Sequence, residues 1–468
     1  MRLLPLLFAL SVSLALPAHA QVRETTIPDA AMHAAAGLRT QALADGTALA
    51  VIESLTTEVG SRLAGSEADA RAVAWAQAKF RELGYDKVWT EPVTFPKWER
   101  RGEHAQVLGA HAQPLLVTAL GGSPGGTVEG EIVRFDSVEA LQAAPAGSLA
   151  GKIAFVDLHM ARTRDGSGYG KAGAVRGKGP SEAIRKGAIG YLMRSLGTSP
   201  HRVANTGITR FDEGLAPIPS AALSLPDADQ LERLLRRGPV HVRLALDCGW
   251  EGEYTSQNVI GEITGRGMPG DVVLIGGHLD SWDLGTGAID DAAGIGITMA
   301  AGRLIAQQPQ RPKRTIRVVA FANEEQGLLG GREYARRHAG DIQRHAIAAE
   351  SDFGAGRIYG FNTGAPEHAQ GAVRRIAEAL APLGIEYLPG RGGAGPDISP
   401  LAAIGGAWAW LGQDGTGYFD LHHNADDTFD KIVPEDVAQN VAAYAVFAYL
   451  AADAEGDFGS APKPDTDR

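Results

Sequence analysis

The chain has 468 residues, of which 44% are hydrophobic and 21% are charged, and it carries 60 Gly and 25 Pro. This length predicts two or three domains with enough apolar residues for large cores. The formal net charge of −11 argues against broad nucleic-acid binding, because an acidic surface repels phosphate. The single cysteine, Cys248, excludes an internal disulfide and a thiolate metal cluster. We expect it to pack as a small hydrophobe, with an intermolecular disulfide as the alternative.

Residues 1–20 have the pattern of a cleaved secretory signal. Arg2 precedes the apolar run LLPLLFALSVSLAL, and the segment closes with Ala18-His19-Ala20. The run is shorter than the roughly 20 apolar residues that a membrane span needs, and no later segment is long and apolar enough. We therefore expect a secreted or periplasmic protein without a membrane span.

The next part of the chain predicts two kinds of structure. Apolar residues recur at helical spacing over 38–59 and 67–83, and residues 87–95 alternate as in a strand. From about 103 to 250 the chain reads as short strands between Gly/Pro turns, with two helical patterns, SEAIRKGAIG and DADQLERLLRR. We assign this β-rich stretch to a domain at 106–250, inserted into a discontinuous domain at 21–105 and 251–456. Residues 457–468 have the composition of a disordered tail.

From residue 256 onward, strand and helix patterns alternate. The strand patterns DVVLIGGHLD, RTIRVVAFAN, HAIAAESDF and GAWAWLG are separated by amphipathic helical patterns. This alternation predicts an α/β domain with a mixed, mostly parallel sheet and helices on both faces. Because ligands bind beyond the carboxyl ends of such strands, we expect the functional residues where these strands end.

Acidic residues and a histidine follow the first of these strands. His278 and Asp280 close it, and residues two apart share a face of a strand, so Asp280 can hold the ring of a metal-binding His278. Asp290-Asp291 opens the following helix. Acids at that place also cap helix amides, so capping is the alternative to metal binding there.

Further acids and histidines follow the later strands. Glu324-Glu325 ends the second strand, and the adjacent acids can divide their roles: one binds metal while the other accepts a proton from water. Asp352 follows the third strand. Of the adjacent His422 and His423, we expect His423 to be the ligand, because Asp427 and Thr428 can support its loop.

The coincidence of these groups at the strand ends of one sheet is the argument for a site. Two imidazoles and three carboxylates come together in the set His278, Asp290, Glu325, Asp352 and His423. Three carboxylates and one hydroxide neutralise two divalent cations, which a buried site requires. Nitrogen and oxygen ligands without thiolate suit two zinc ions, with manganese or cobalt as substitutes. The sequence therefore predicts a hydrolase with two metals that share one water.

The chain resembles the M28 family of zinc exopeptidases and, within it, the carboxypeptidase Q branch. Four motifs carry this resemblance in order: HLDSWDLGTGAIDDAAG, FANEEQGLLGG, ESD and HHNADDT. The segment GKIAFVDL followed by EAIRKGAIGYL is similar to a protease-associated domain. The resemblance covers nearly all of the chain after residue 20.

The resemblance implies a role for each metal ligand. His278 and Asp352 would bind one zinc, Glu325 and His423 would bind the other, and Asp290 would bridge them. It also implies that the peptide bond after Asp290 is cis.

The same resemblance implies the catalytic groups and a substrate pocket. Glu324 would be the general base for a water bridging the metals, and Asp280 would orient His278. Gly393 stands where some members have a tyrosine that assists the oxyanion, so that assistance would come from elsewhere or be absent. Asp397 and Ser399 are candidate substrate-binding residues, because they lie in a Gly-rich loop where members of the family often place substrate-contacting groups. Further candidates flank the motifs, with ordinary packing as the alternative: Trp282, Tyr418, Phe419 and His422.

The implied activity is that of an exported exopeptidase acting on dipeptides or short peptides. Aminopeptidase and carboxypeptidase or dipeptidase specificities stay open. The alternatives are a catalytically inactive M28-like binding protein and a single-zinc acyltransferase of the glutaminyl cyclase type. The resemblance also implies a homodimer, although no sequence feature identifies an interface.

Overall fold

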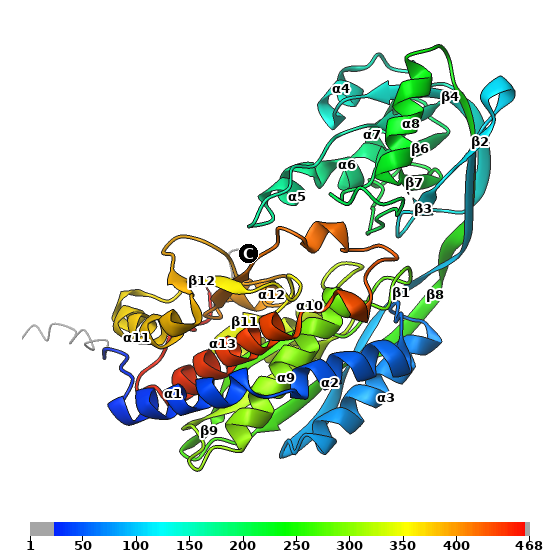
Figure 1. Cartoon of the computed structure of the whole chain (residues 1–468). Helices are drawn as coiled ribbons and strands as arrows, with labels where there is room; N and C mark the ends of the chain where they lie inside the picture. The colour runs from blue at the N-terminus through cyan, green and yellow to red at the C-terminus, as the bar shows by residue number, and fades with distance from the viewer. Residues whose placement is uncertain (1–22, 464–468) are drawn as a thin grey trace, which may run out of the picture.

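The computed structural model describes residues 23–463, which form two lobes joined by two long strands (Figure 1). The predicted signal at 1–20 and residues 464–468 of the predicted tail lie outside the described residues. The joining strands are β1 (Lys87–Val107) and β8 (His241–Ile263), which pair antiparallel along nearly their whole length. Side chains alternate between buried and exposed over 91–96 of β1, as in a strand with one covered face. The boundaries predicted near residues 105 and 250 fall inside these strands.

The sheet of the first lobe has the strand order β11-β9-β10-β8. Its three parallel strands are β9 (Met268–His278), β10 (Arg314–Phe321) and β11 (His345–Glu350), and β8 runs antiparallel to β10. β10, β11 and residues 272–278 of β9 are buried almost throughout, because helices cover both faces of the sheet. The predicted mixed sheet is therefore confirmed.

Helices form a layer on each face of this sheet. One face shares a core with α1 (Asp29–Leu43), α2 (Thr47–Ser54), α3 (Glu67–Glu82), α9 (Ala293–Ala306), α11 (Gln370–Leu380) and α13 (Pro434–Asp453). The other face packs against α10 (Leu329–His338) and α12 (Ser399–Ala403). A small sheet lies beside them, with the order β13 (Glu386–Tyr387), β12 (Ile358–Thr363) and β14 (Ala409–Gln413). No helix within 23–463 has both the length and the apolar character to cross a bilayer.

The second lobe continues the sheet from the far end of β8, in the order β4-β5-β6-β7-β3. Its strands are β2 (Gln113–Leu115), β3 (Val117–Ala119), β4 (Gly126–Phe135), β5 (Ile153–Val156), β6 (Gly190–Arg194) and β7 (Ser220–Leu223). Its helices are α4 (Val138–Ala143), α5 (Ser167–Ala172), α6 (Ala174–Gly177), α7 (Gly179–Arg185) and α8 (Leu225–Leu235). The sequence predicted only α7 and α8, because the other three helices are too short for a clear apolar period.

Cys248 lies in the apolar core of the second lobe, as the packing prediction required. Its side chain is buried, and Sγ lies 3.4 Å from the carbonyl oxygen of Ser123. Burial raises the pKa of this thiol to about 11. A buried, protonated thiol does not favour the intermolecular disulfide that was the alternative.

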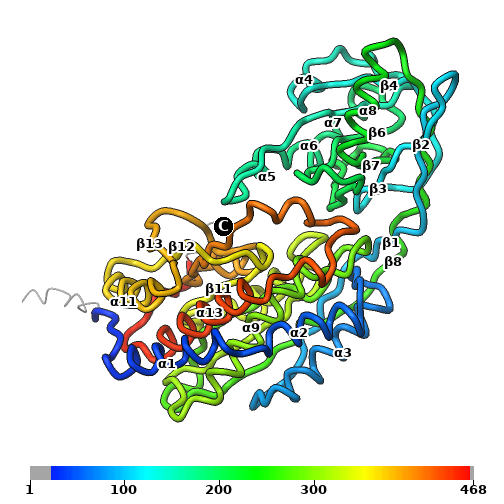
Figure 2. Tube along the Cα trace, viewed as in Figure 1, coloured from blue at the N-terminus to red at the C-terminus, as the bar shows by residue number. Residues whose placement is uncertain are grey.

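The two lobes meet a second time, away from β1 and β8, where the region of α5 lies over the loop after β14 (Figure 2). The amide of Thr198 donates to the carbonyl of Phe419 at 3.1 Å, and the amide of Thr206 donates to the carbonyl of His423 at 2.9 Å. The Arg162 guanidinium pairs with Asp420 at 2.6 Å. The second lobe therefore contacts a loop that carries predicted site residues.

Residues 457–463, predicted as part of a disordered tail, pack against the first lobe. Phe458 is fully buried, and the amide of Ala461 donates to the carbonyl of Gly405 at 3.0 Å. The buried side chain of Phe458 holds this polar segment against the lobe. The average composition of the tail predicts disorder because it gives no weight to one aromatic residue.

Candidate metal centre

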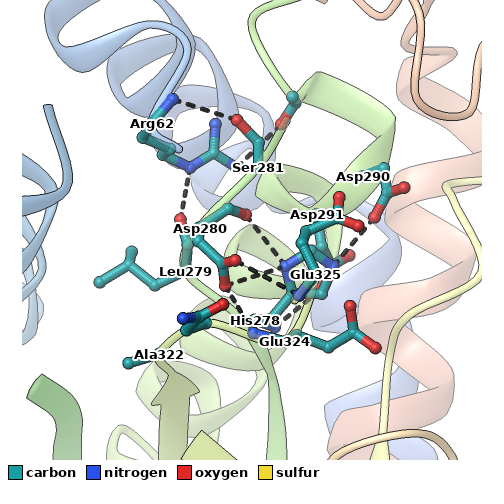
Figure 3. Close-up of polar contacts among 12 residues, drawn as sticks. Arg62, His278, Leu279, Asp280, Ser281, Asp290, Asp291, Ala322, Glu324 and Glu325 are labelled. Carbon is teal, nitrogen blue, oxygen red and sulfur yellow. Dashed lines mark hydrogen bonds and ion pairs between the residues drawn. The ribbon is translucent and has the colours of Figure 1, made fainter. Parts of the chain in front are cut away.

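The predicted site lies at the carboxyl edge of the parallel strands. β9 ends at His278, β10 ends three residues before Glu324, and β11 ends two residues before Asp352. Because these strands are parallel and adjacent, their ends bring the three side chains to one edge of the sheet. Figure 3 shows the groups that follow β9 and β10 converging there.

The Asp290 carboxylate lies between two imidazoles. Its Oδ1 is 2.9 Å from Nε2 of His278, and its Oδ2 is 3.3 Å from Nε2 of His423. Asp352 Oδ1 approaches the same His278 nitrogen at 3.5 Å, and Glu325 Oε2 approaches the same His423 nitrogen at 2.8 Å. All five predicted ligands are therefore brought together. Two triads that share Asp290 have the spacing to hold a metal ion: His278 with Asp352, and His422 with His423.

The backbone around Asp290 leaves its carboxylate free for this position. The Asp290-Asp291 peptide bond is cis, as predicted. Asp291 accepts hydrogen bonds from the amides of His278 and Gly294, each at 3.0 Å, so Asp291 rather than Asp290 supports the start of α9. Asp427 accepts from the amides of Ile289 and Asp290 at 2.6 and 3.2 Å.

Asp280 holds both His278 and the two acids that follow β10. Its backbone carbonyl lies 2.9 Å from Nδ1 of His278, while its carboxylate is farther from that nitrogen, at 3.6 Å. The carboxylate instead accepts hydrogen bonds from the amides of Glu324 at 3.0 Å and Glu325 at 3.4 Å (Figure 3). Asp280 thus positions the ring through its backbone and the acids through its side chain.

Arg62 is a supporting residue that the sequence did not reveal. It is fully buried, and its guanidinium donates to the carbonyl of Leu279 (Figure 3). It also donates to the carbonyls of Thr286 and Gly287. These bonds fix the loop that leads from His278 to Asp290. The sequence does not predict this role, because Arg62 and these three carbonyls are more than 200 residues apart in the chain.

The two adjacent histidines occupy a loop held by the second lobe. His423 has a left-handed backbone, with φ of 61°, and its Nδ1 lies 3.3 Å from the carbonyl oxygen of Thr206. The His422 ring stacks on it, with centroids 3.4 Å apart, and the Asn205 amide donates to the His422 carbonyl at 2.6 Å. His422 Nε2 is 3.7 Å from Asp290 Oδ2, farther than Nε2 of His423. Asn205 and Thr206 were not identified from the sequence.

The centre gathers buried acids and histidines that shift one another's pKa values. Burial, reinforced by the charges of Asp352 and Glu325, raises the pKa of Glu324 well above its ordinary value. Burial opposes a charge on His423, but Glu325 and Asp290 outweigh it and raise the pKa of His423 to about 10. Such an accumulation of buried carboxylates favours bound cations.

The sequence and fold match those of known peptidases. Residues 258–448 match the model of peptidase family M28. Carboxypeptidase Q of Homo sapiens is 33% identical over 405 residues, spanning 86% of this chain and 84% of the human protein. A crystal structure of a peptidase M28 precursor from Shewanella amazonensis SB2B has a TM-score of 0.90 and 47% identity, and the match covers 93% of this chain and all of that one. The chain belongs to peptidase family M28.

This M28 peptidase is accordingly a hydrolase of the metallo-exopeptidase class, as predicted. Its fold is also shared by a zinc aminopeptidase from Bacillus subtilis, with a TM-score of 0.63 and 20% identity over 88% of this chain and 98% of that one.

The M28 peptidase has a cavity of ≈ 350 Å³ beside the candidate metal centre. Glu324 lies on its wall together with Asp290, Asp352 and the two adjacent histidines. Of the predicted substrate-binding residues, Tyr418, Phe419 and His422 line it.

The other predicted substrate-binding residues are not on this wall. Trp282 is buried behind His423, with ring centroids 5.9 Å apart. Asp397 is buried and accepts from the amide of Gly331 at 3.0 Å, and the exposed Ser399 donates to the carbonyl of Pro396 at 2.7 Å. Proximity to a motif along the chain does not fix which way a side chain points.

Proposed function

We propose that this M28 peptidase is an exported exopeptidase that binds two zinc ions and hydrolyses dipeptides or short peptides from a terminus, with Glu324 as general base. The observation that carries the proposal is the position of Asp290, which offers one oxygen to each of two imidazoles beside a cavity that Glu324 also lines. The predicted signal at residues 1–20 supports export.

The residues fit a pair of cations. Within 23–463, Glu325 Oε1 is buried without a hydrogen-bond partner, and the buried Asp290 Oδ2 is approached by His423 Nε2 at 3.3 Å without a hydrogen bond. Such burial is costly for a carboxylate unless a cation binds it. Nitrogen and oxygen donors without thiolate suit zinc, with manganese or cobalt as substitutes. His278 and Asp352 would hold one ion, Glu325 and His423 the other, and Asp290 both.

Bound zinc would polarise the scissile carbonyl and acidify water. Glu324 would accept a proton from the attacking water on its carboxylate and return it to the leaving amine. Its backbone amide is held by Asp280, which fixes the start of the side chain relative to the cavity. Tyr418 and Phe419 would exclude bulk water from one wall.

The test is hydrolysis of a panel of free dipeptides, each compared with its N-acetylated and C-amidated forms, with metal content measured on the same sample. We expect turnover of free dipeptides and two zinc ions per chain. One metal per chain with acyl transfer would replace the proposal with a glutaminyl cyclase-type reaction. Neither metal nor turnover would replace it with a binding protein.

A further inference from the structure

A second cavity, of ≈ 260 Å³, adjoins the one beside the metal centre. Asp352, Phe353 and Pro396 line both cavities, so the two meet at a residue that we propose as a metal ligand. We call the second cavity the side pocket. Both lobes form it, because Asp165 precedes α5 in the second lobe and the other lining residues belong to the first. The side pocket is therefore next to any substrate held at the centre.

The charges that line the side pocket are of one sign. Its described lining residues include three acids, Asp165, Glu350 and Asp352, and no lysine, arginine or histidine. Asp165 is exposed at the entrance, where the Arg391 guanidinium approaches it only to 3.9 Å, whereas Glu350 is 9% exposed. A cleft lined by one sign of charge concentrates ligands of the opposite sign. The lining therefore favours a cationic group.

Glu350 has an acceptor oxygen that the protein leaves unused. It ends β11, and its Oε2 accepts from the amides of Asp397 at 2.9 Å and Ile398 at 3.3 Å. Its Oε1 is buried without a hydrogen-bond partner among residues 23–463. Such burial costs free energy that a bound donor would recover. Because Glu350 is not a proposed metal ligand, a donor from the substrate is the partner that the side pocket can supply.

Glycines and an aromatic ring give the side pocket its shape. A Cβ built on Gly412 would lie 2.1 Å from the Trp410 ring, so this glycine lets the ring lie over β14 and form one wall. A Cβ on Gly395 would lie 2.6 Å from Oε2 of Glu350, so the loop approaches Glu350 through a glycine. A Cβ on Gly393 would meet no atom within 4 Å. Apolar walls around a buried acid suit a long side chain that has a methylene stem and a charged end.

The position of Glu324 indicates which substrate residue faces the side pocket. Glu324, which would return a proton to the leaving amine, lines the larger cavity and is not among the described residues that line the side pocket. The leaving amine would therefore face the larger cavity, and the residue that supplies the scissile carbonyl would face the side pocket. The ≈ 260 Å³ of the side pocket is several times the roughly 30 Å³ of one liquid water, so a long side chain has room there.

We propose that the side pocket binds a cationic side chain, such as that of lysine or arginine, of the substrate residue on the amino side of the scissile bond. Glu350 accepts from its charged end, and Asp165 attracts it at the entrance. This inference rests on the proposed function and makes it more specific. The centre supplies the reaction, and the side pocket selects the residue whose carbonyl is attacked.

The test compares lysyl-alanine with norleucyl-alanine on the zinc-loaded wild-type enzyme and on three variants. Both peptides have the α-ammonium and the methylene stem, so the ratio of their kcat/KM values reports the side-chain ammonium and cancels a general loss of activity. The wild type should favour lysyl-alanine by roughly 10- to 100-fold, the range for a hydrogen bond to a charged group. Glu350→Gln should bring the ratio close to one. Asp165→Asn should lower it less, because Asp165 is exposed, and Glu378→Gln on α11 should leave it unchanged.

Gly393→Leu tests the side pocket without altering Glu350. The new side chain would enter the open space at Gly393. Turnover of lysyl-alanine and norleucyl-alanine should fall relative to turnover of glycyl-alanine, which has no side chain to place there. An equal change for all three peptides would mean that the substrate does not use the side pocket.

A wild type that does not favour lysyl-alanine over norleucyl-alanine, or a Glu350→Gln variant with the wild-type ratio, would overturn the inference. A preference for alanyl-lysine over lysyl-alanine would overturn the assignment to the amino side. To separate these results from failure of the proposed function, the peptides are titrated calorimetrically into Glu324→Gln, with and without Glu350→Gln. A Glu350-dependent preference for lysyl-alanine in binding, without turnover by the wild type, would refute the peptidase reaction and retain the side pocket. Turnover without any such preference would retain the reaction and refute the side pocket.

Discussion

The two imidazoles of the candidate metal centre are held in different ways. His278 ends strand β9, is fully buried, and has its ring nitrogen Nδ1 at 2.9 Å from the backbone carbonyl of Asp280, two residues away. His423 lies in a loop with a left-handed backbone, and its Nδ1 contacts the carbonyl of Thr206, which belongs to the other lobe. We call these the sheet side and the loop side of the centre.

This difference shows which parts of the structure hold the side chains of the centre in place. On the sheet side, the hydrogen-bonded register of three parallel strands fixes where each side chain begins. On the loop side, the ring orientation depends on docking of the second lobe through Asn205, Thr206 and Arg162. The second lobe is therefore a structural part of the centre, and the two sides should respond differently to mutation.

The largest effect should come from Glu324→Gln on the sheet side. Losing a general base costs roughly 10²- to 10⁴-fold in kcat, while zinc content should not change because Glu324 is not a proposed ligand. Steady-state kinetics and metal analysis on one preparation test this. Glu378→Gln, an exposed residue of α11, is the control that should leave both unchanged. Near-normal turnover by Glu324→Gln would remove Glu324 as the base.

Asp280→Asn should have the next largest effect. The carboxylate accepts from the amides of Glu324 and Glu325, so the substitution replaces one acceptor oxygen by a donor that repels an amide. Changes next to metal ligands typically cost about 10- to 100-fold in metal affinity or activity. Chelator competition and kcat measure the two losses. Because the backbone carbonyl of Asp280 holds His278, we expect the substitution to displace Glu325 more than His278. Unchanged zinc affinity and kcat would mean that the sheet edge alone holds Glu324 and Glu325.

The residues of the sheet side could be predicted from the sequence because of the topology of the sheet. Parallel strands end at one edge, so residues such as His278, Glu324 and Asp352 could be placed together without knowing any distance. The ligand set follows from this rule and from the acid–histidine chemistry. The start of α9 shows the limit of this rule. Two adjacent acids lie there, and the sequence pattern does not tell which of them accepts the backbone hydrogen bonds; in the structure it is Asp291.

The loop side and the joining strands could not be predicted in the same way. The contact between Asn205 and His422 joins residues 217 apart in sequence, and no local period encodes it. The long pairing of β1 with β8 is interrupted by register shifts near Pro96 and Arg100, which break the alternation that marks a strand. Trp282 shows that a residue inside a motif can point into a core instead of a cavity.

Asn205→Ala should have a smaller effect, confined to the loop side. It removes one buried hydrogen bond to the His422 carbonyl, which corresponds to a loss of about 10-fold or less in kcat/KM. A chelator titration that follows zinc content should show one ion per chain leaving earlier than in the wild type, and the second leaving at the normal concentration. Loss of both ions together would mean that the two sides form one cooperative unit, contrary to the comparison above.

Arg162→Met should have the smallest effect. The guanidinium pairs with Asp420 and also donates to the carbonyls of Thr416 and Thr198, but the paired side chains are 40% and 30% exposed. Exposed ion pairs contribute about 0–1 kcal/mol, so kcat/KM should fall by less than roughly fivefold. Because salt screens exposed charges, the difference between variant and wild type should shrink as sodium chloride is raised. Arg185→Met, which breaks a pair within the second lobe, is the control. A fall in activity as large as that of Asp280→Asn would mean that the exposed pair of Arg162 with Asp420 holds the loop side. Docking of the second lobe would then matter as much for the activity of the centre as the edge of the sheet.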